Sequence, residues 1–313
     1  MSMNTRRPFR HLFLFLLALM LCGCGKLRPS EPISLDEAEQ KFADILKNEF
    51  KVAAVIKKTQ DTVWVYVPLQ ENLMQVAATP EGAQKSETSE ERPAIKHLET
   101  SYANRRFLLT FDIRPETTYA QSQGYKLDYT TAYRQTSQHI LTAVSQAYFE
   151  TVRAPRFFVI VTADARNGVE IENILYLEDL KRYMAMESIP QEEFVKRNIY
   201  EVRGRADWIG DTEGRHLAYR EITMPEFLAR QITSRVNFKY QKSSFPPSND
   251  ARGEILNIVA ETLKNYNFTD FNYVELRDLN AGLTETVLPA ELIHKAEQPD
   301  TSGSPVGDSL RSQ

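Results

Sequence analysis

The chain has only two cysteines, Cys22 and Cys24, and both follow directly after an apolar run near its start. The sequence beyond Cys24 must therefore fold without a disulfide bond. Cysteine catalysis, thiolate zinc sites and iron–sulfur clusters are excluded there for the same reason. Stability has to come from apolar packing, and a hydrophobic content of 42% in 313 residues is enough for one or two globular domains.

The apolar run occupies residues 12–21 and follows Arg6, Arg7 and Arg10. A helix of about 10 residues is about 15 Å long, roughly half the thickness of the hydrocarbon core of a bilayer. The run is therefore typical of an export signal and too short for a permanent membrane span. Because the positive start should stay in the cytoplasm, the downstream chain is predicted to cross the membrane.

Residues 21–24 read Leu-Cys-Gly-Cys, which resembles the lipobox of bacterial lipoproteins. The resemblance covers about the first 25 residues. It implies that residues 1–23 are a signal peptide, that cleavage follows Gly23, and that Cys24 carries the lipid that holds the chain to a membrane. Gly25 stands where enteric-type bacteria use Asp as an inner-membrane retention signal. The resemblance therefore implies the outer membrane, facing the periplasm, in a host with two membranes.

Charge and motifs narrow the function of the exported part. Loss of the three leader arginines changes the formal net charge from −4 to −7, which gives no general reason to bind nucleic acid. The sequence contains no nucleophile elbow, no phosphate-binding loop, no zinc-protease helix motif and no dinucleotide-binding turn. We therefore predict no cofactor, no metal site and no catalytic residues.

The hydrophobic patterns predict an α+β fold in which antiparallel β hairpins pack against amphipathic helices. The order helix–strand–strand occurs three times, at about 34–69, 128–177 and 250–288. These passages could be repeated units. Since their sequences do not visibly align, an ordinary α+β topology explains them equally well.

Composition suggests how the chain is divided. Residues 24–33 form a tether after the lipidated cysteine, and residues 34–69 form a small helix–strand–strand unit that begins with a capping box at Ser34 and Glu37. Residues 70–98 are rich in Gln, Glu, Ser and Thr and predict a mobile linker. A larger α+β domain is expected at 99–288, followed by a disordered tail at 289–313.

One short cluster is a candidate site. Residues 207–216 contain Asp207, Asp211, Glu213 and His216. Oxygen ligands in a flexible turn suit Ca²⁺, and carboxylates beside a histidine could act in acid–base chemistry. The spacing does not fit an EF-hand, however, and Asp and Gly are ordinary turn residues. Because the sequence offers no second cluster of His, Asp and Glu to meet this one, we predict a structural turn.

Several other side chains are weaker candidates. The tyrosines could bind a sugar or a peptide but fit better as residues at the edge of the core. The tryptophan fits a packed sheet position, and the arginines have acidic neighbours that should neutralise them. The histidines are expected in the linker, on a helix flank and in the tail. These residues are Tyr119, Tyr125, Tyr129 and Tyr133; Trp64; Arg203, Arg205, Arg215 and Arg220; and His97, His139 and His294.

Together these observations predict an envelope lipoprotein without catalytic activity that serves as an interaction or assembly component. The expected partners are the membrane, through the lipid on Cys24, and another envelope protein. The alternatives are a lipoprotein that binds a small ligand or glycan, and a hydrolase of unrecognised type.

Overall fold

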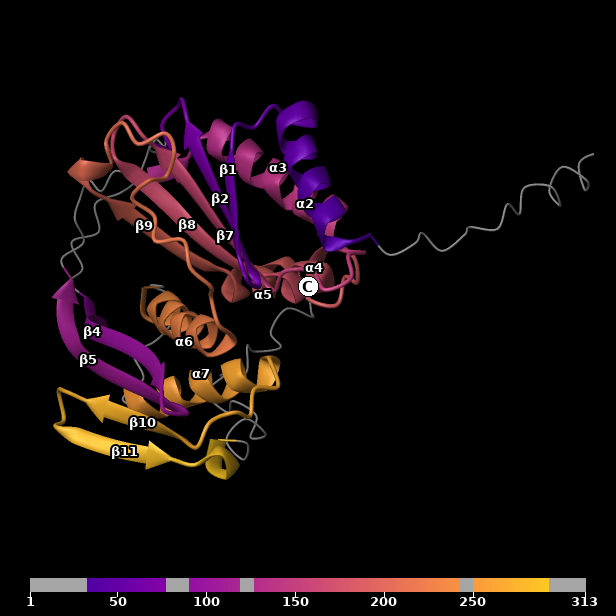
Figure 1. Ribbon diagram of the computed structural model, residues 1–313. Coiled ribbons are helices and arrows are strands. Elements are labelled where there is room, and N and C mark those ends of the chain that lie inside the picture. Colours follow the sequence, from indigo (N-terminus) through magenta and orange to yellow (C-terminus); the bar gives the residue numbers. More distant parts are fainter. Residues whose placement is uncertain (1–32, 77–89, 119–126, 242–249, 293–313) are drawn as a thin grey trace, which may run out of the picture.

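The computed structural model describes residues 33–76, 90–118, 127–241 and 250–292 (Figure 1). The predicted α+β class is confirmed, with antiparallel-rich sheets packed against helices. The elements lie in four layers: a helical layer, a five-stranded sheet, a pair of helices and a four-stranded sheet. Within the described ranges, no helix combines the length and the apolar character needed to cross a bilayer.

The first sheet has the strand order β1-β2-β7-β8-β9. Its strands are β1 (Val55–Thr59), β2 (Thr62–Leu69), β7 (Phe157–Asp164), β8 (Val169–Tyr176) and β9 (Ile199–Gly204). Neighbouring strands are antiparallel except β2 and β7, which run parallel with Thr62 opposite Phe157. β7 is buried along its whole length, as expected for a central strand with both faces covered.

Helices cover one face of this sheet. They are α2 (Leu35–Asp44) with its π-helical extension η1 (Ile45–Glu49), α3 (Thr131–Tyr148) and α4 (Leu177–Met184). The predicted capping box is present, because Ser34 N–H donates to Glu37 Oε2 at 3.0 Å and Glu37 N–H donates to Ser34 Oγ at 3.3 Å. Phe42 of α2 meets Tyr148 of α3 with ring centroids 5.6 Å apart.

This packing contradicts the expectation of a separate unit at 34–69. β2 pairs with β7 from Thr62 to Leu69, and the buried side chains of α2 share one core with those of α3. The physical reason is that β2 needs a neighbour on each edge and a layer on each face, which one helix and one hairpin cannot provide. Residues 34–69 therefore belong to the same folded body as the chain that follows.

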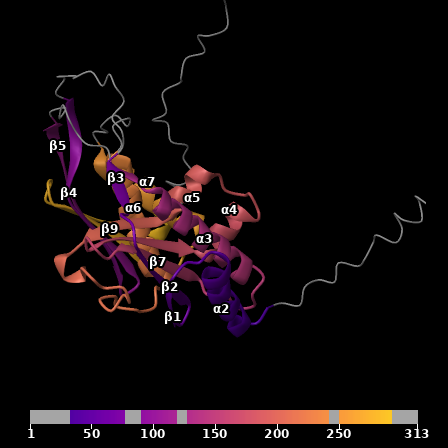
Figure 2. The ribbon, with the colours of Figure 1, turned by 90° about the horizontal axis from the view of Figure 1, so that it is seen from above.

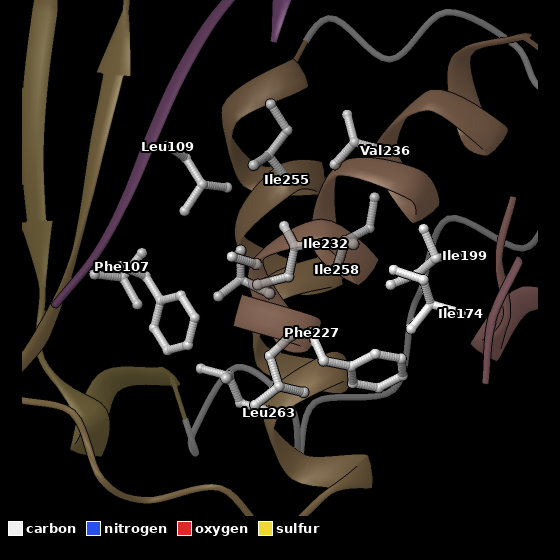
Figure 3. Close-up of a cluster of buried hydrophobic side chains, with 14 of the residues drawn as sticks. Phe107, Leu109, Ile174, Ile199, Phe227, Ile232, Val236, Ile255, Ile258 and Leu263 are labelled. Atoms are coloured by element: carbon white, nitrogen blue, oxygen red, sulfur yellow. The ribbon is translucent and has the colours of Figure 1, made fainter. Parts of the chain in front are cut away.

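The second half of the fold places two helices between two sheets. These are α6 (Met224–Gln241) and α7 (Ala251–Asn265), and the second sheet has the order β11-β10-β5-β4. Its strands are β4 (Glu90–Ala103), β5 (Arg106–Thr118), β10 (Tyr273–Asp278) and β11 (Leu283–Val287). Figure 3 shows side chains from both sheets meeting those of the helices, among them Phe107, Ile174 and Phe227. Seen from above, β4 and β5 lie at one side of the molecule and α2 at the other (Figure 2).

The prediction of a linker at 70–98 is wrong at both ends of that range. Residues 74–76 form β3 (Met74–Val76), which pairs with β6 (Leu127–Tyr129), and residues 90–98 lie in β4. β4 pairs with β5 along its whole length, so backbone hydrogen bonds order a segment that is poor in apolar side chains. Residues 77–89 lie outside the described ranges. His97 accordingly lies in a strand, not in a linker.

The remaining expectations concern the ends of elements. The helix of the passage expected at 128–177 begins at Thr131, because Thr130 accepts the N-cap hydrogen bond from Tyr133 N–H and Asp128 is part of β6. The prediction of a disordered tail from residue 289 starts too early, because Leu292 is buried in the core. Cys24 and residues 293–313 lie outside the described ranges.

Candidate functional site

The candidate cluster lies in residues 205–223, which connect β9 to α6 across the face of the first sheet; we call this segment the strap. Its only regular element is the 3₁₀ turn η2 (Ala206–Trp208). Long irregular connections in compact domains are usually functional or disordered, but this one is fixed to the sheet by hydrogen bonds. They run from Arg205 N–H to Gly168 O, from Gly210 N–H to Ala165 O, from Trp64 Nε1–H to Arg220 O, and from Ile222 N–H to Thr62 Oγ1.

His216 is held between two carboxylates in the strap and the sheet. Its Nδ1 lies 2.5 Å from Asp211 Oδ2, and its Nε2 lies 2.8 Å from Glu170 Oε2. Glu170 comes from β8 and is almost completely buried. We call Glu170, Asp211 and His216 the histidine clamp.

Aromatic rings and one glycine fix the position of the clamp. The ring of Trp208 stacks on His216 at 4.6 Å, and Tyr66 of β2 meets the imidazole edge-on at 6.0 Å. Tyr66 Oη–H also donates to Asp211 O. Gly214 has φ +65°, and a Cβ there would lie 2.8 Å from the Tyr66 ring, so only glycine allows the strap to approach β2 this closely.

The clamp shifts the pKa of each member. Burial raises the pKa of Glu170, and the hydrogen bond from His216 offsets this only in part. Burial would lower the pKa of His216, but the hydrogen bonds and charges of Asp211 and Glu170 outweigh it, so the pKa is raised. Burial would likewise raise the pKa of Asp211, but donors from His216 and Glu213 lower it to about 2. The imidazolium form of His216 is therefore favoured.

This geometry suits a structural role better than a chemical one. A general base needs a ring nitrogen free to take a proton from a substrate, and a metal ligand needs a free lone pair. Both nitrogens of His216 are already occupied by carboxylates. Among the residues that the structure describes, no group of three or more His, Cys, Asp or Glu side chains is arranged to hold a metal ion.

Glu170 was not among the residues singled out in the sequence. We expected no second cluster of His, Asp and Glu to meet the turn, and a single glutamate from a strand 46 residues away does so. The signal in the sequence was the alternation Val169-Glu170-Ile171-Glu172, which places two acids on one face of a buried strand. Such acids require a cationic partner on the layer above.

Glu172 has such a partner too. Its carboxylate lies 2.6 Å from Arg230 of α6 and 3.0 Å from Arg203 of β9, and both arginines also pair with Glu201. The other arginines near the strap are paired as well, as their acidic neighbours suggested. The pairs are Arg205 with Asp207, Arg215 with Glu213, and Arg220 with Glu226.

A second buried network joins four helices, and we call it the helix network. Asp179 of α4 lies 2.9 Å from Arg197 Nη1 at the end of α5 (Gln191–Arg197) and accepts a hydrogen bond from Tyr266 Oη–H. Arg197 Nε also lies 2.7 Å from Glu193, and Gln231 of α6 donates to Arg197 O. These contacts hold the helices together, although the side-chain oxygen of Gln231 is buried without a hydrogen-bond partner among the described residues.

The remaining candidates are placed as follows. Trp64 is buried and stacks edge-on with Tyr219, as expected for a packed sheet residue. Tyr129 and Tyr133 meet with ring centroids 4.9 Å apart at the edge of the core, and His139 stacks on Phe50. Tyr119, Tyr125 and His294 lie outside the described residues.

A pocket of about 300 Å³ lies beside the strap, at the carboxyl ends of β2 and β7. It is lined by Pro68, Leu69, Gln70, Ala165, Arg166, Ile209, Gly210 and Thr212. This volume is at the lower limit of ligand pockets.

No protein-family model, curated protein or solved structure matches the chain.

Proposed function

We propose that the chain is a lipid-anchored envelope lipoprotein whose folded part is an interaction component without catalytic activity. The observation that carries the proposal is the Leu-Cys-Gly-Cys sequence at 21–24, directly after a short apolar run with a positive start. The histidine clamp supports the second half, because the histidine that chemistry would need has no free ring nitrogen.

Replacing Cys24 with serine tests the anchor. We expect Cys24→Ser to abolish incorporation of labelled lipid, because the thioether needs this sulfur, and to move the chain from the membrane fraction to the soluble fraction or leave it uncut. Metabolic labelling with a radioactive fatty acid measures this. Cys22→Ser is the matched control and should be labelled like the wild type. Labelling that persists in Cys24→Ser and disappears in Cys22→Ser would show that Cys22 carries the lipid and would contradict the prediction.

Gly25 leads to a second prediction, which concerns the membrane in which the protein is found. In a two-membrane host we expect most of the protein in the outer-membrane fraction, because Gly25 is not the Asp of the inner-membrane retention signal. Fractionation with marker enzymes for both membranes measures this. Gly25→Asp should shift the protein to the inner membrane, and a wild-type protein found mainly with inner-membrane markers would contradict the prediction.

A further inference from the structure

The two edges of the first sheet differ in how they are protected. The edge strand β1 carries Lys57 and Lys58, and charged lysines on an edge strand prevent pairing with another chain. Lys57 Nζ lies 3.9 Å from the centre of the Tyr219 ring, and Lys58 pairs with Glu39 at 2.6 Å. Both faces of that edge are therefore covered by a long charged side chain.

The opposite edge, β9, lacks this protection on one face, because its charged residues Glu201 and Arg203 lie together on the other face and pair with each other. Its sequence, Ile-Tyr-Glu-Val-Arg-Gly, has no lysine and no proline. Tyr200 is 42% exposed and Val202 is 53% exposed, which is unusual for apolar side chains in a sheet. Within the described part of the chain, no residue outside β8 hydrogen-bonds to the backbone of residues 199–204.

The hydrogen-bond pattern shows which residues of β9 have a free backbone. Arg205 N–H donates to Gly168 O at 2.9 Å, in register with the β8–β9 ladder. Hydrogen-bonded pairs alternate along an antiparallel ladder, so Arg203 and Glu201 also direct their N–H and C=O groups to β8. The residues between them direct theirs to the open edge. They are Tyr200, Val202 and Gly204.

We propose that this edge pairs with the same edge of a second copy of the chain, antiparallel and about a two-fold axis at Val202. Isologous two-fold contacts are the commonest way in which identical chains associate. With Val202 opposite Val202 of the second copy, Tyr200 faces Gly204 and all three outward residues meet outward residues. The two five-stranded sheets become one continuous sheet.

The side chains of β9 are complementary to themselves in this register. Glu201 stands opposite Arg203 of the second copy, in a pair that is not hydrogen-bonded through the backbone, where side chains approach most closely. Opposite charges in such pairs stabilise a sheet, whereas like charges would destabilise it. The network of Glu172, Arg203, Glu201 and Arg230 thus continues across the axis. On the other face, Tyr200 lies over Gly204 of the second copy, which has no side chain to obstruct the ring.

A cysteine on the axis tests the pairing in the purified full-length chain in detergent micelles. A hydrogen-bonded pair has its Cα atoms about 5.5 Å apart, within the range that a disulfide requires. Under mild oxidation we expect Val202→Cys to form at least about tenfold more disulfide-linked dimer than the control, because the two thiols are held face to face. Val152→Cys is the matched control, since Val152 has the same exposure of 53% but lies just after α3. The wild type shows how much disulfide-linked dimer Cys22 and Cys24 form by themselves. A dimer that arises because Cys24 is not lipidated is therefore not mistaken for cross-linking at position 202.

Two further variants test the interface without a cysteine. Val202→Lys gives β9 the protection that β1 already has, and Val202→Pro removes an N–H that points to the open edge, so the ladder with β8 is kept. We expect both to convert the dimer to monomer by light scattering, with unchanged circular dichroism. Equal cross-linking of Val202→Cys and Val152→Cys, or a wild type that is monomeric at all concentrations, would overturn the proposal in favour of a different partner for this edge.

Discussion

Asp179→Ala is expected to lower the free energy of unfolding by about 3–5 kcal/mol, the usual cost of removing one partner of a buried ion pair. Asp179 is 1% exposed and Arg197 is 6% exposed, so water cannot replace the lost carboxylate. The variant leaves the Arg197 guanidinium with Glu193 alone and removes the acceptor of Tyr266 Oη–H. Urea titration followed by circular dichroism measures the change.

Asp207→Ala is the matched control. It also removes one aspartate from an ion pair, but Asp207 and Arg205 are both more than half exposed. Exposed pairs contribute less than about 1 kcal/mol. The two variants change net charge equally, so the difference between them reports the burial of Asp179 together with its hydrogen bond from Tyr266. If Asp179→Ala costs no more than Asp207→Ala, the helix network does not hold α4 and α5 against α6 and α7.

The features predicted correctly from the sequence depend on neighbouring residues. The capping box needs only Ser34 and Glu37, and both its hydrogen bonds form within one turn. The passage expected at 128–177 contains β7, because the run of apolar and β-branched residues there suits a buried strand. Trp64 was placed correctly because the alternation along β2 already assigned it to a packed face.

The features missed depend on residues far apart in the chain. Nothing in the composition of residues 90–98 indicates a strand, since β4 is ordered by its pairing with β5. The parallel pairing of β2 with β7 joins segments about 95 residues apart by register, as the partners Thr62 and Phe157 show. Glu170 was missed for the same reason: the strand and the strap each carry half of the clamp, and only the fold brings the halves together.

His216→Gln is expected to lower the free energy of unfolding by about 2–4 kcal/mol at pH 6. Hydrogen bonds to charged groups contribute about 1.5–3 kcal/mol each, and the variant loses the charge in two of them while its amide can keep part of the geometry. Glu170 then stays buried without its hydrogen-bonded cation, and only the charge of Arg203 remains near it. His139→Gln is the control, because His139 stacks on Phe50 and has no carboxylate partner among the described residues, and we expect it to cost about 1 kcal/mol.

The clamp also predicts how stability depends on pH. The pKa of His216 is raised in the folded chain, so its contribution is complete below the ordinary value of 6.5 and is lost as pH rises through the raised pKa. Glu170 acts in the same direction from pH 4.5 upward, because its pKa is also raised. The wild type should therefore lose stability as pH rises above 6.5, and the double variant Glu170→Gln with His216→Gln should lose much less.

Asp211 has the opposite effect on the pH dependence. Because its pKa is lowered to about 2, its carboxylate stabilises the fold above pH 3.8, and this contribution is lost as pH falls toward 2. Melting temperatures measured from pH 2 to pH 9 separate the acid flank from the alkaline flank. A double variant with the wild-type loss above pH 6.5 would mean that another group titrates there and that His216 does not carry its charge between the two carboxylates.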